Sequence, residues 1–345
     1  MAKSLFPIPK GQWQRIINLF GLLCGLFPFV SYLFFILSVG QGPIDYETFM
    51  AIGERLIQGK QVYGENSYYP LPYVMIFALF RLLPKPLNVF IWFCLPVIMA
   101  LYIARWKPWV LFFAPLYSHF VGGQSSLFGM LAAWGYRRNS QTHKIAGGVF
   151  LALALLKPQL ALFPTLYAFS TWIKEIHFQK KIPSQFLAWV STALILYAPA
   201  FVLYPQWLGD WLQAPRPFFE RALAGLVPRI LVSAQLHPTL LWLLLLIITL
   251  IIWVSLLVYV KSMPFDVWMI GSFIINPFVH DYDLIQLIPF LHTKKEQIIA
   301  VLASIPGWLT ILLAYQNDQA WFTFTLIAPA LLWVKTLEER HQAGH

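Results

Sequence analysis

Charged side chains are scarce in this sequence. Only 11% of the 345 residues are Asp, Glu, Lys or Arg, less than half of the roughly 25% found in an ordinary soluble domain. A soluble fold of this length needs far more polar surface, because even a compact domain leaves much of its area in water. The composition therefore excludes a soluble enzyme, a disordered tail and a nucleic-acid-binding module.

Cysteine is almost absent as well. The only two, Cys24 and Cys94, both lie inside apolar stretches, where a buried thiol behaves as a small hydrophobic side chain. No CxxC pair or regular cysteine spacing is present. The sequence therefore predicts neither a disulfide framework nor a cysteine-bound metal.

Hydrophobic residues are abundant instead. They make up 59% of the 345 residues, or about 204 residues, and roughly 20 residues form one membrane-spanning helix. That number suffices for about ten crossings. We therefore expect an all-α, polytopic integral membrane protein, a multi-pass protein of the cell membrane, in which residues 1–345 form one membrane-embedded domain.

The few positive charges indicate the orientation of the chain. The net charge is +10, and the lysines and arginines stand in short connections between apolar runs, as the positive-inside rule predicts for cytoplasmic loops. Lys3, Lys10 and Arg15 precede the first apolar run, residues 16–39, so we expect a cytoplasmic N-terminus and a first transmembrane helix. Further basic segments follow at 174–181, 261, 294–295 and 335–340.

Counting the apolar runs gives about 12 transmembrane helices with both termini in the cytoplasm. The count in the first half depends on the runs at 71–83, 87–104, 109–136, 145–156 and 160–173. If each of the first two runs crosses the membrane, Arg105 and Lys107 fall on the extracytoplasmic side, against the positive-inside rule. The helix count between residues 70 and 136 is therefore the least certain part of this topology.

Two extracytoplasmic loops are expected, at 41–69 and 204–237. The first holds four of the 14 carboxylates of the chain. Within it, Phe49, Ile52, Leu56 and Ile57 recur at helical spacing, which predicts a short amphipathic helix on the membrane surface. The second loop mixes arginine with aromatic residues, a composition that suits a sugar or phosphate contact and also an ordinary interfacial helix.

Several apolar runs are too short to span a bilayer. The runs at 145–156, 265–276 and 284–292 extend at most about 18 Å as helices, against a hydrocarbon core of roughly 30 Å. Irregular backbone at membrane depth is tolerated only where it lines protein or water. The turns between such short helices are therefore where we expect polar chemistry.

Asp45 is the candidate base in the first loop, with Tyr63 and Tyr69 as aromatic neighbours. A carboxylate held against the interface is partly desolvated, which raises its basicity and suits it to take a proton from a hydroxyl. The alternative is a solvated loop acid beside interfacial tyrosines.

Lys157 stands in a Leu-Lys-Pro-Gln turn between two apolar runs. A lysine in such surroundings is unfavourable unless it reaches the interface or meets an anion. It is therefore either a snorkelling boundary lysine or a binder of a lipid phosphate, for which a point charge serves well.

Two more interruptions carry polar side chains. The glycines at 122–123 permit a helix break beside Gln124, which suits either a hydrogen bond to a substrate hydroxyl or close helix packing. Near the C-terminus, His280, Asp281 and Asp283 share one turn. They suit a phosphate, a sugar or half of a metal site, although no second cluster supplies further ligands, and a hydrated loop is the simpler alternative.

The order of these motifs resembles glycosyltransferase family 87, bacterial membrane mannosyltransferases of the GT-C fold that use a polyprenyl-phosphate sugar. The resemblance covers roughly residues 15–295 and consists of Asp-Tyr, Gly-x-x-Val-Tyr, Tyr-Tyr-Pro-x-Pro, Gly-Gln, Leu-Lys-Pro-Gln and Asn-Pro…His-x-Tyr. It implies that Asp45 is the catalytic base and that Lys157 and His280 hold the phosphate of the donor. Gln124, Asp281, Asp283, Tyr63 and Tyr69 are the further substrate-binding candidates.

The implied reaction moves a hexose, mannose by the resemblance, from a polyprenyl-phosphate donor to a hydroxyl of a glycolipid or glycan acceptor. It takes place on the extracytoplasmic face with inversion, and without a metal or cofactor. A polytopic transporter or lipid flippase is the competing class, although transporters often contain repeats and none is visible here. A non-catalytic membrane scaffold is the third.

Overall fold

The computed structural model describes residues 12–64, 67, 69–214, 224–235, 237–259, 264–313 and 318–343. These residues form helices and turns and contain no strand, which confirms the all-α prediction. Three helical segments of the described chain are long and apolar enough to cross a membrane, namely Gly21–Val39, Lys85–Ile103 and Ser184–Leu203. Five shorter apolar helices accompany them. The architecture is consistent with a helical membrane protein.

The first half of the chain contains α1 (Gln12–Phe20), η1 (Gly21–Gly25), α2 (Leu26–Val39), α3 (Ile44–Ile57), α4 (Leu71–Arg81), α5 (Lys85–Ile103), η2 (Pro108–Phe112), α6 (Ala114–Gly122), α7 (Leu127–Asn139), α8 (Lys144–Leu153), η3 (Ala154–Leu156) and α9 (Pro158–Gln179). The second half contains α10 (Ser184–Leu203), α11 (Trp207–Gln213), α12 (Leu226–Ser233), α13 (Pro238–Tyr259), α14 (Phe265–Ile275), η4 (Asp281–Phe290), α15 (Lys294–Leu313), η5 (Asp318–Leu326) and α16 (Ile327–Ala343).

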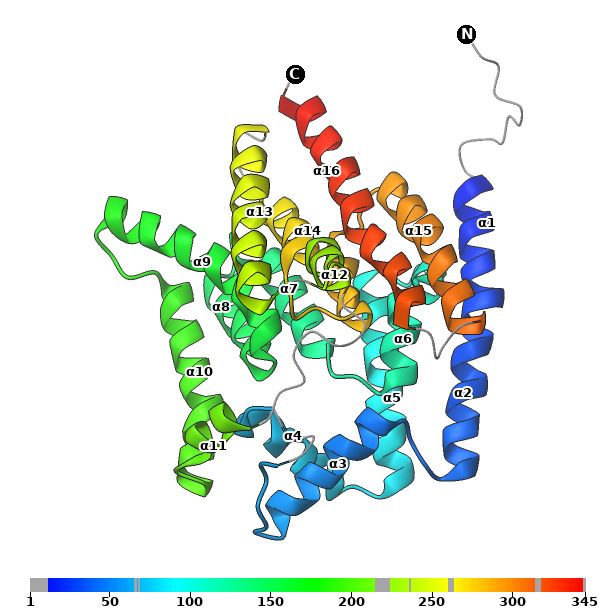
Figure 1. The fold of residues 1–345 in the computed structure, drawn as a ribbon, viewed down its shortest axis with the longest axis vertical. Helices are drawn as coiled ribbons and strands as arrows, with labels where there is room; N and C mark the ends of the chain where they lie inside the picture. Colours follow the sequence, from blue (N-terminus) through cyan, green and yellow to red (C-terminus); the bar gives the residue numbers. More distant parts are fainter. Residues whose placement is uncertain are drawn as a thin grey trace.

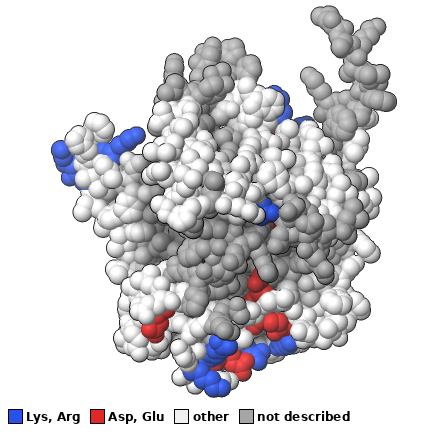
Figure 2. Space-filling model, in the orientation of Figure 1, with Lys and Arg blue, Asp and Glu red and all other residues white. Residues whose placement is uncertain are grey.

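The molecule has two distinct ends (Figure 1). α3, α4 and α11 lie at one of them, called the α3 end below, and the start of α1, the turn from α9 to α10 and the end of α16 lie at the other, called the termini end. On the face drawn in Figure 2, acidic and basic side chains gather over α3, and basic ones gather at the end of α9. Most of the surface between them is uncharged, as expected for the part of a protein that lies in a bilayer.

The predicted first helix is a continuous helical rod made of α1, η1 and α2. Its one irregularity is the π-helical turn η1, where Gly21 and Gly25 pack against η2. A Cβ atom on Gly21 would lie 2.3 Å from the carbonyl oxygen of Pro108. The two glycines therefore let the backbones of η1 and η2 touch, which a larger side chain prevents.

The amphipathic helix predicted in the first loop is α3, but its apolar face is covered by protein. Phe49 and Ile52 are buried, and the ring of Phe49 stacks on that of Phe77 in α4 at 4.7 Å. Gly53 lies so close to α4 that a Cβ atom there would stand 2.6 Å from the backbone of Phe77. The expectation that this face lies on the membrane surface is therefore wrong for its central residues.

α4 forms a hairpin with α3 and does not extend across the molecule. It has 11 residues, about 16 Å of helix, and Arg81 at its end contacts Glu54 of α3 at 2.9 Å. α5 then begins at the α3 end, where the Lys85 ammonium group lies 2.5 Å from the carbonyl oxygen of Gly40. Because α5 is long enough to cross, Arg105 lies at the opposite end from Lys85. The topology expected from the sequence instead put Arg105 on the side of the 41–69 segment.

The predicted short helices are present, and the polar turns divide them. The 109–136 run is split into η2, α6 and α7, and the 145–156 run forms α8 and η3. α14 has 11 residues and is followed by the 3-10 helix η4. α6 and α7 pack against η4, and α7 packs against α8. The short helices therefore form the interior of the protein, and the long apolar helices α2 and α10 have largely exposed surfaces.

Some residues discussed from the sequence lie outside the described part of the chain. They are Lys3, Lys10 and Lys261, one of the four carboxylates of the 41–69 segment (Glu65), the first tyrosine of the Tyr-Tyr-Pro-x-Pro motif (Tyr68), and two arginines of the 204–237 segment (Arg216 and Arg221). Within the 204–237 segment the structure describes the short helices α11 and α12.

Replacing Gly123 with alanine is expected to destabilise the protein by about 2–4 kcal/mol. Gly123 has a φ of +62°, a conformation that costs an L-residue roughly 1–2 kcal/mol, and its new Cβ atom would lie 2.7 Å from Cβ of Tyr46, which adds an overpacking cost. Gly59 is the matched control, because its φ is +63° and no atom lies within 4 Å of the place that a methyl group would take. Gly59→Ala should cost only about 1–2 kcal/mol. Equal losses in detergent unfolding curves would contradict a steric role for Gly123.

Candidate active site

Four turns from distant parts of the sequence meet on the inner side of α3. They carry Asp45 at the start of α3, residues 124–126 between α6 and α7, Lys157 between η3 and α9, and residues 280–283 at the start of η4. Hydrogen bonds join the first turn to the second, and the second and third to the fourth. Each turn interrupts an apolar run, so the sequence places the polar groups where helices end.

Asp45 projects from the first turn of α3. Pro43 is the N-cap residue and fixes the start of the helix in an extended conformation. The side-chain amide of Gln124 donates a hydrogen bond to Oδ2 of Asp45. The pairing requires the sharp turn at Gly123, which lies directly against Pro43 and Tyr46.

The surrounding protein raises the pKa of the Asp45 carboxyl group above its usual range, because crowding desolvates the charged form. The hydrogen bond from Gln124 and the positive charge of Lys157 act in the opposite direction and moderate this rise. Asp45 nevertheless remains an exposed residue. A partly desolvated carboxylate that is still accessible has the properties of a general base.

Lys157 and Asp283 form a buried ion pair at 2.7 Å, with side chains that are 2% and 0% exposed. The lysine ammonium group also donates to Oγ of Ser126 at 3.1 Å and lies 4.9 Å from the ring centre of Tyr282. Oδ2 of Asp283 accepts the backbone N–H of His280 at 2.9 Å, and Ser126 donates to its Oδ1. Asp283 therefore balances the charge of Lys157 within the protein.

This pairing changes the role expected for Lys157. It is not a snorkelling boundary lysine, because its side chain is buried in the interior. A phosphate that approaches Lys157 meets the Lys157–Asp283 ion pair, whose net charge is zero. Any attraction of the phosphate therefore depends on how the N–H groups of the Lys157 ammonium are oriented. The partnership with Asp283 spans 126 residues of sequence, and sequence spacing alone gives no sign of it.

Asp281 faces a different partner from its neighbour Asp283. It is 3% exposed, and its Oδ2 accepts a hydrogen bond from the hydroxyl of Ser118 in α6. The next residue, His119, is 2% exposed, and its Nε2 has no hydrogen-bond partner among the described residues. Ser118 and His119 were not predicted from the sequence, although two polar residues inside the apolar run at 113–121 were the available signal.

Aromatic rings surround the polar turns. Tyr69 stacks on Tyr73 with ring centres 4.7 Å apart, and the Tyr73 hydroxyl donates to Oγ of Ser125. The rings of His280 and Tyr282 are stacked at 5.1 Å. Tyr69 and His280 thus lie beside the hydrogen-bonded turns, and their role in substrate binding stays a prediction.

Tyr63 belongs to a separate cluster. Its ring is stacked on that of Tyr204 at 6.3 Å, and it is packed with Leu71 and Trp207. The structure therefore does not bring Tyr63 to the hydrogen-bonded turns. Among the described residues, no group of three His, Cys, Asp or Glu side chains is placed to hold a metal ion, since Asp281 and Asp283 point to different partners.

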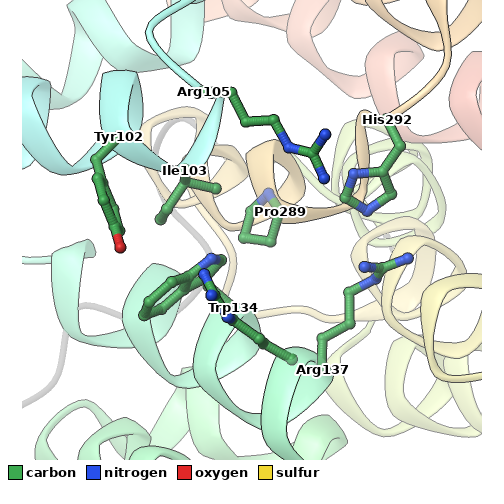
Figure 3. Close-up of a pocket in the computed structure, with 8 residues that line it drawn as sticks. Tyr102, Ile103, Arg105, Trp134, Arg137, Pro289 and His292 are labelled. Atoms are coloured by element: carbon green, nitrogen blue, oxygen red, sulfur yellow. The ribbon is translucent and has the colours of Figure 1, made fainter.

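Two cavities lie away from these turns. One, of about 450 Å³, is at the termini end and is lined in part by Arg105, Arg137 and His292 (Figure 3). The other, of about 600 Å³, lies along α3 and α4 and is mainly apolar, with Leu56, Met75, Leu79, Leu82 and Leu203 in its wall. Neither is lined by Asp45, Lys157 or Asp283.

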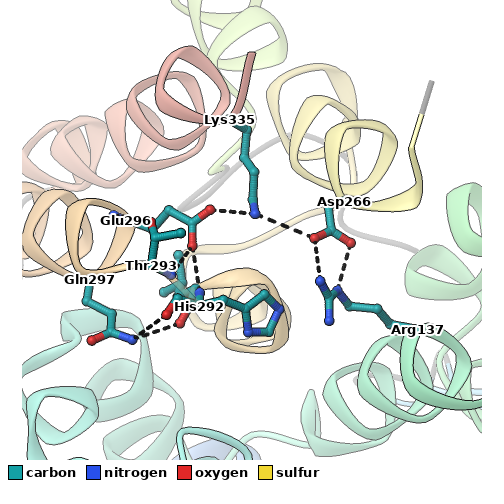
Figure 4. Close-up of polar contacts among 8 residues, drawn as sticks. Arg137, Asp266, His292, Thr293, Glu296, Gln297 and Lys335 are labelled. Carbon is teal, nitrogen blue, oxygen red and sulfur yellow. Dashed lines mark hydrogen bonds and ion pairs between the residues drawn. The ribbon is translucent and has the colours of Figure 1, made fainter. Parts of the chain in front are cut away.

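A second polar network holds four helices together near the termini end (Figure 4). Arg137 of α7 makes two hydrogen bonds of 2.8 and 2.9 Å to Asp266 of α14. Lys335 of α16 lies 3.5 Å from Asp266 and 2.5 Å from Glu296 of α15. Glu296 also accepts the backbone N–H groups of His292 and Thr293 and so caps α15. This network is well explained as structural, because its acids and bases satisfy one another.

The fold is all-helical and consistent with a membrane protein, and its polar centre is built from interrupted helices. Comparison of the chain with known protein families, with curated proteins and with solved structures gives no match. The function must therefore be argued from the site itself.

Proposed function

We propose that the protein is a membrane glycosyltransferase with a GT-C-like arrangement of about 12 transmembrane helices. It transfers a hexose, mannose by the family resemblance, from a polyprenyl-phosphate donor to a hydroxyl of a glycolipid or glycan acceptor. The observation that carries this proposal is the accessible Asp45 carboxylate, which Gln124 orients at the junction of four polar turns. A carboxylate with raised basicity near an interface suits the removal of a proton from a hydroxyl.

We propose further that the α3 end faces the extracytoplasmic side and that both termini are cytoplasmic. Arg137 and Arg138 end α7, Lys180 ends α9, and Arg105 follows α5. With α4 folded back on α3, Arg105 joins the other basic residues at the termini end. This orientation therefore agrees with the positive-inside rule at Arg105, where the topology expected from the sequence did not.

In the proposed reaction the acceptor hydroxyl oxygen attacks the anomeric carbon of the donor sugar. Asp45 takes the hydroxyl proton, the new glycosidic bond forms, and the bond from the anomeric carbon to the phosphate oxygen breaks. The electron pair leaves with the polyprenyl phosphate. A single displacement inverts the configuration of the sugar carbon.

The leaving phosphate needs hydrogen-bond donors, which the neighbouring turns supply. The hydroxyl of Ser125, which accepts from Tyr73 and keeps its own proton to donate, and the imidazole of His280 lie on these turns. The Lys157–Asp283 pair fixes the turns relative to one another. Preorganised donors in a site of low dielectric constant stabilise developing charge more strongly than water does.

The apolar cavity along α3 and α4 also favours a lipid-linked substrate. Leu56 at its wall is 11 residues from Asp45 on the same helix, about 16 Å along the helix axis. A cavity lined mainly by apolar side chains suits a hydrocarbon chain.

The test is a transfer assay with the full-length chain in detergent and in sealed vesicles. Synthetic polyprenyl-phosphate mannose and polyprenyl-phosphate glucose are offered with glycolipid acceptors, and products are identified by mass spectrometry. We expect a new glycosidic bond of inverted configuration at a rate at least about tenfold above protein-free vesicles. Movement of labelled lipid across the vesicle membrane without any new bond would favour the transporter or flippase class instead.

A further inference from the structure

The cavity of about 450 Å³ at the termini end has a lining unlike the rest of this apolar protein. It is formed where α5, α7 and η4 end, and its wall includes Arg105, Arg137, Arg138, His292, Tyr102 and Trp134. In Figure 3 the side chains of Arg105 and His292 extend toward each other above Pro289, and Arg137 approaches from the opposite wall. No part of the proposed transfer reaction uses these residues.

The positive charges of this cavity are not balanced within the described part of the protein. Arg137 is paired with Asp266, and Asp266 also contacts Lys335. Arg105 and Arg138 have no carboxylate partner among the described residues. Guanidinium groups that share one cavity repel one another, and an anion bound between them removes that repulsion.

The backbone beside the cavity is held in an unfavourable conformation. Arg105 and Trp106 have φ values of 56° and 58°, in the left-handed region that residues other than glycine rarely adopt. Backbone hydrogen bonds from Arg105 to Tyr102 and from Trp106 to Leu101 hold this turn. These two hydrogen bonds form the Schellman motif that ends α5, and this motif sets the direction in which Arg105 leaves α5.

Aromatic side chains complete the wall. The guanidinium of Arg138 lies 5.6 Å from the ring centre of Trp134, which restricts its orientation. Tyr102, in the wall, is 46% exposed, and Trp106, which follows Arg105 in the chain and is not part of the wall, is 61% exposed, as is common for aromatic residues at a membrane interface. The charged groups thus lie beside a surface that hydrocarbon chains can contact.

We propose that this cavity binds a phosphate group, carried either by the headgroup of an anionic lipid or by a small soluble phosphate ester. Arginine suits this ligand because its planar guanidinium donates two parallel hydrogen bonds to phosphate oxygens. A volume of about 450 Å³ accommodates a phosphate with a glycerol-sized group and leaves the acyl chains of a lipid outside, against Tyr102 and Trp106.

The test measures binding to the full-length chain in an uncharged detergent. The probes are phosphatidylglycerol, phosphatidylcholine with the same acyl chains, glycerol 3-phosphate and inorganic phosphate. The variant is the double substitution Arg105→Gln with Arg138→Gln. The matched control is Arg55→Gln, which removes one arginine of α3 at the other end of the molecule. Binding is followed by native mass spectrometry, and the ligand-free unfolding temperature verifies that each protein is folded.

For the wild type we expect phosphatidylglycerol to bind more tightly than phosphatidylcholine. The double variant should raise the Kd for phosphatidylglycerol at least about tenfold, since each lost charge-assisted contact weakens binding substantially, and Arg55→Gln should leave it within about twofold. Arg138→Lys keeps the charge but not the planar fork, so it should weaken binding by a smaller factor. If the double variant does not fold, the Arg138→Lys variant still tests the role of the Arg138 guanidinium in binding.

The soluble probes identify the source of the phosphate. Binding of phosphatidylglycerol that depends on Arg105 and Arg138 supports a lipid headgroup. Binding of glycerol 3-phosphate or inorganic phosphate alone, with the same dependence, supports a soluble ester. The proposal is overturned if no probe binds, or if the double variant and Arg55→Gln change Kd equally. A failure of the transfer assay leaves this proposal unaffected, because its contacts lie at the other end of the protein.

Discussion

Replacing Asp45 with asparagine is expected to lower kcat/KM for sugar transfer by about 10²- to 10⁴-fold, the usual contribution of a general base. The amide keeps the shape of the carboxyl group and still accepts a hydrogen bond from Gln124, but it does not take a proton. Glu47 is the matched control, because it lies half a turn away on α3 and interacts with Lys85 at 3.7 Å. Glu47→Gln should change kcat/KM by no more than about threefold, which corresponds to a surface ion pair of under 1 kcal/mol.

The pH dependence provides a second measure of the same residue. Because crowding raises the pKa of Asp45, the wild-type rate should increase with pH through a value above the ordinary 3.8, where the carboxyl group loses its proton. Asp45→Asn should lack this rise. In Gln124→Leu the moderating hydrogen bond is lost, so the rise should move to higher pH. Equal rates for wild type and Asp45→Asn, or the same pH profile in both, would rule out Asp45 as the base.

The same shift determines how Asp45 affects stability. A folded-state pKa above the unfolded value of 3.8 means that the protonated form favours folding. Its contribution is complete below that value and is lost as the pH rises through the folded-state pKa. At pH 7 the unfolding temperature of the Asp45→Asn variant should therefore be at least as high as that of the wild type. Lost activity then reflects chemistry and not a damaged fold.

The positions of the polar turns could be predicted from the sequence because their causes are local. Gly123 and Pro158 interrupt helices by their own backbone chemistry, so the breaks beside Gln124 and Lys157 were found where the structure has them. The apolar spacing in residues 49–57 likewise indicated α3. The element that packs against α3 was not predictable from the sequence. An apolar helix face has the same hydrophobic spacing whether lipid or α4 covers it.

The partners within the site could not be predicted, because each partner comes from a distant segment. Lys157 meets Asp283 across 126 residues, and Ser118 meets Asp281 across 163 residues. Hydropathy also does not distinguish an apolar helix that crosses from one that turns back. For that reason α4, which folds back on α3, was counted as a crossing, and the resulting topology put Arg105 on the side of the 41–69 segment.

The buried pair itself leads to the largest expected effects on stability. Asp283→Asn leaves the ammonium group of Lys157 in the interior without a counter-ion, and Lys157→Met leaves the carboxylate of Asp283 without one. Each single variant should lose about 3–5 kcal/mol of unfolding free energy. The double variant removes both charges, so we expect it to be more stable than either single variant, with a coupling energy of at least about 2 kcal/mol.

The exposed pair of Arg81 and Glu54 is the control for this cycle. Both side chains are 41% exposed at a separation of 2.9 Å, so the cycle of Arg81→Gln and Glu54→Gln should give a coupling energy below about 1 kcal/mol. Unfolding in mixed micelles measures both cycles under the same conditions. Additive losses at Lys157 and Asp283 would mean that the contact at 2.7 Å contributes no net energy.

The double variant also separates the two roles of Lys157. If the lysine only fixes the turns through Asp283, restoring charge balance should restore the donor KM along with stability. If its ammonium group also contacts the donor phosphate, the donor KM of the stable double variant should remain raised by roughly tenfold, the loss of one charge-assisted hydrogen bond of about 1.5 kcal/mol. The acceptor KM should not change in either case. A rise confined to the acceptor KM would assign Lys157 to the acceptor and contradict its place beside the leaving phosphate.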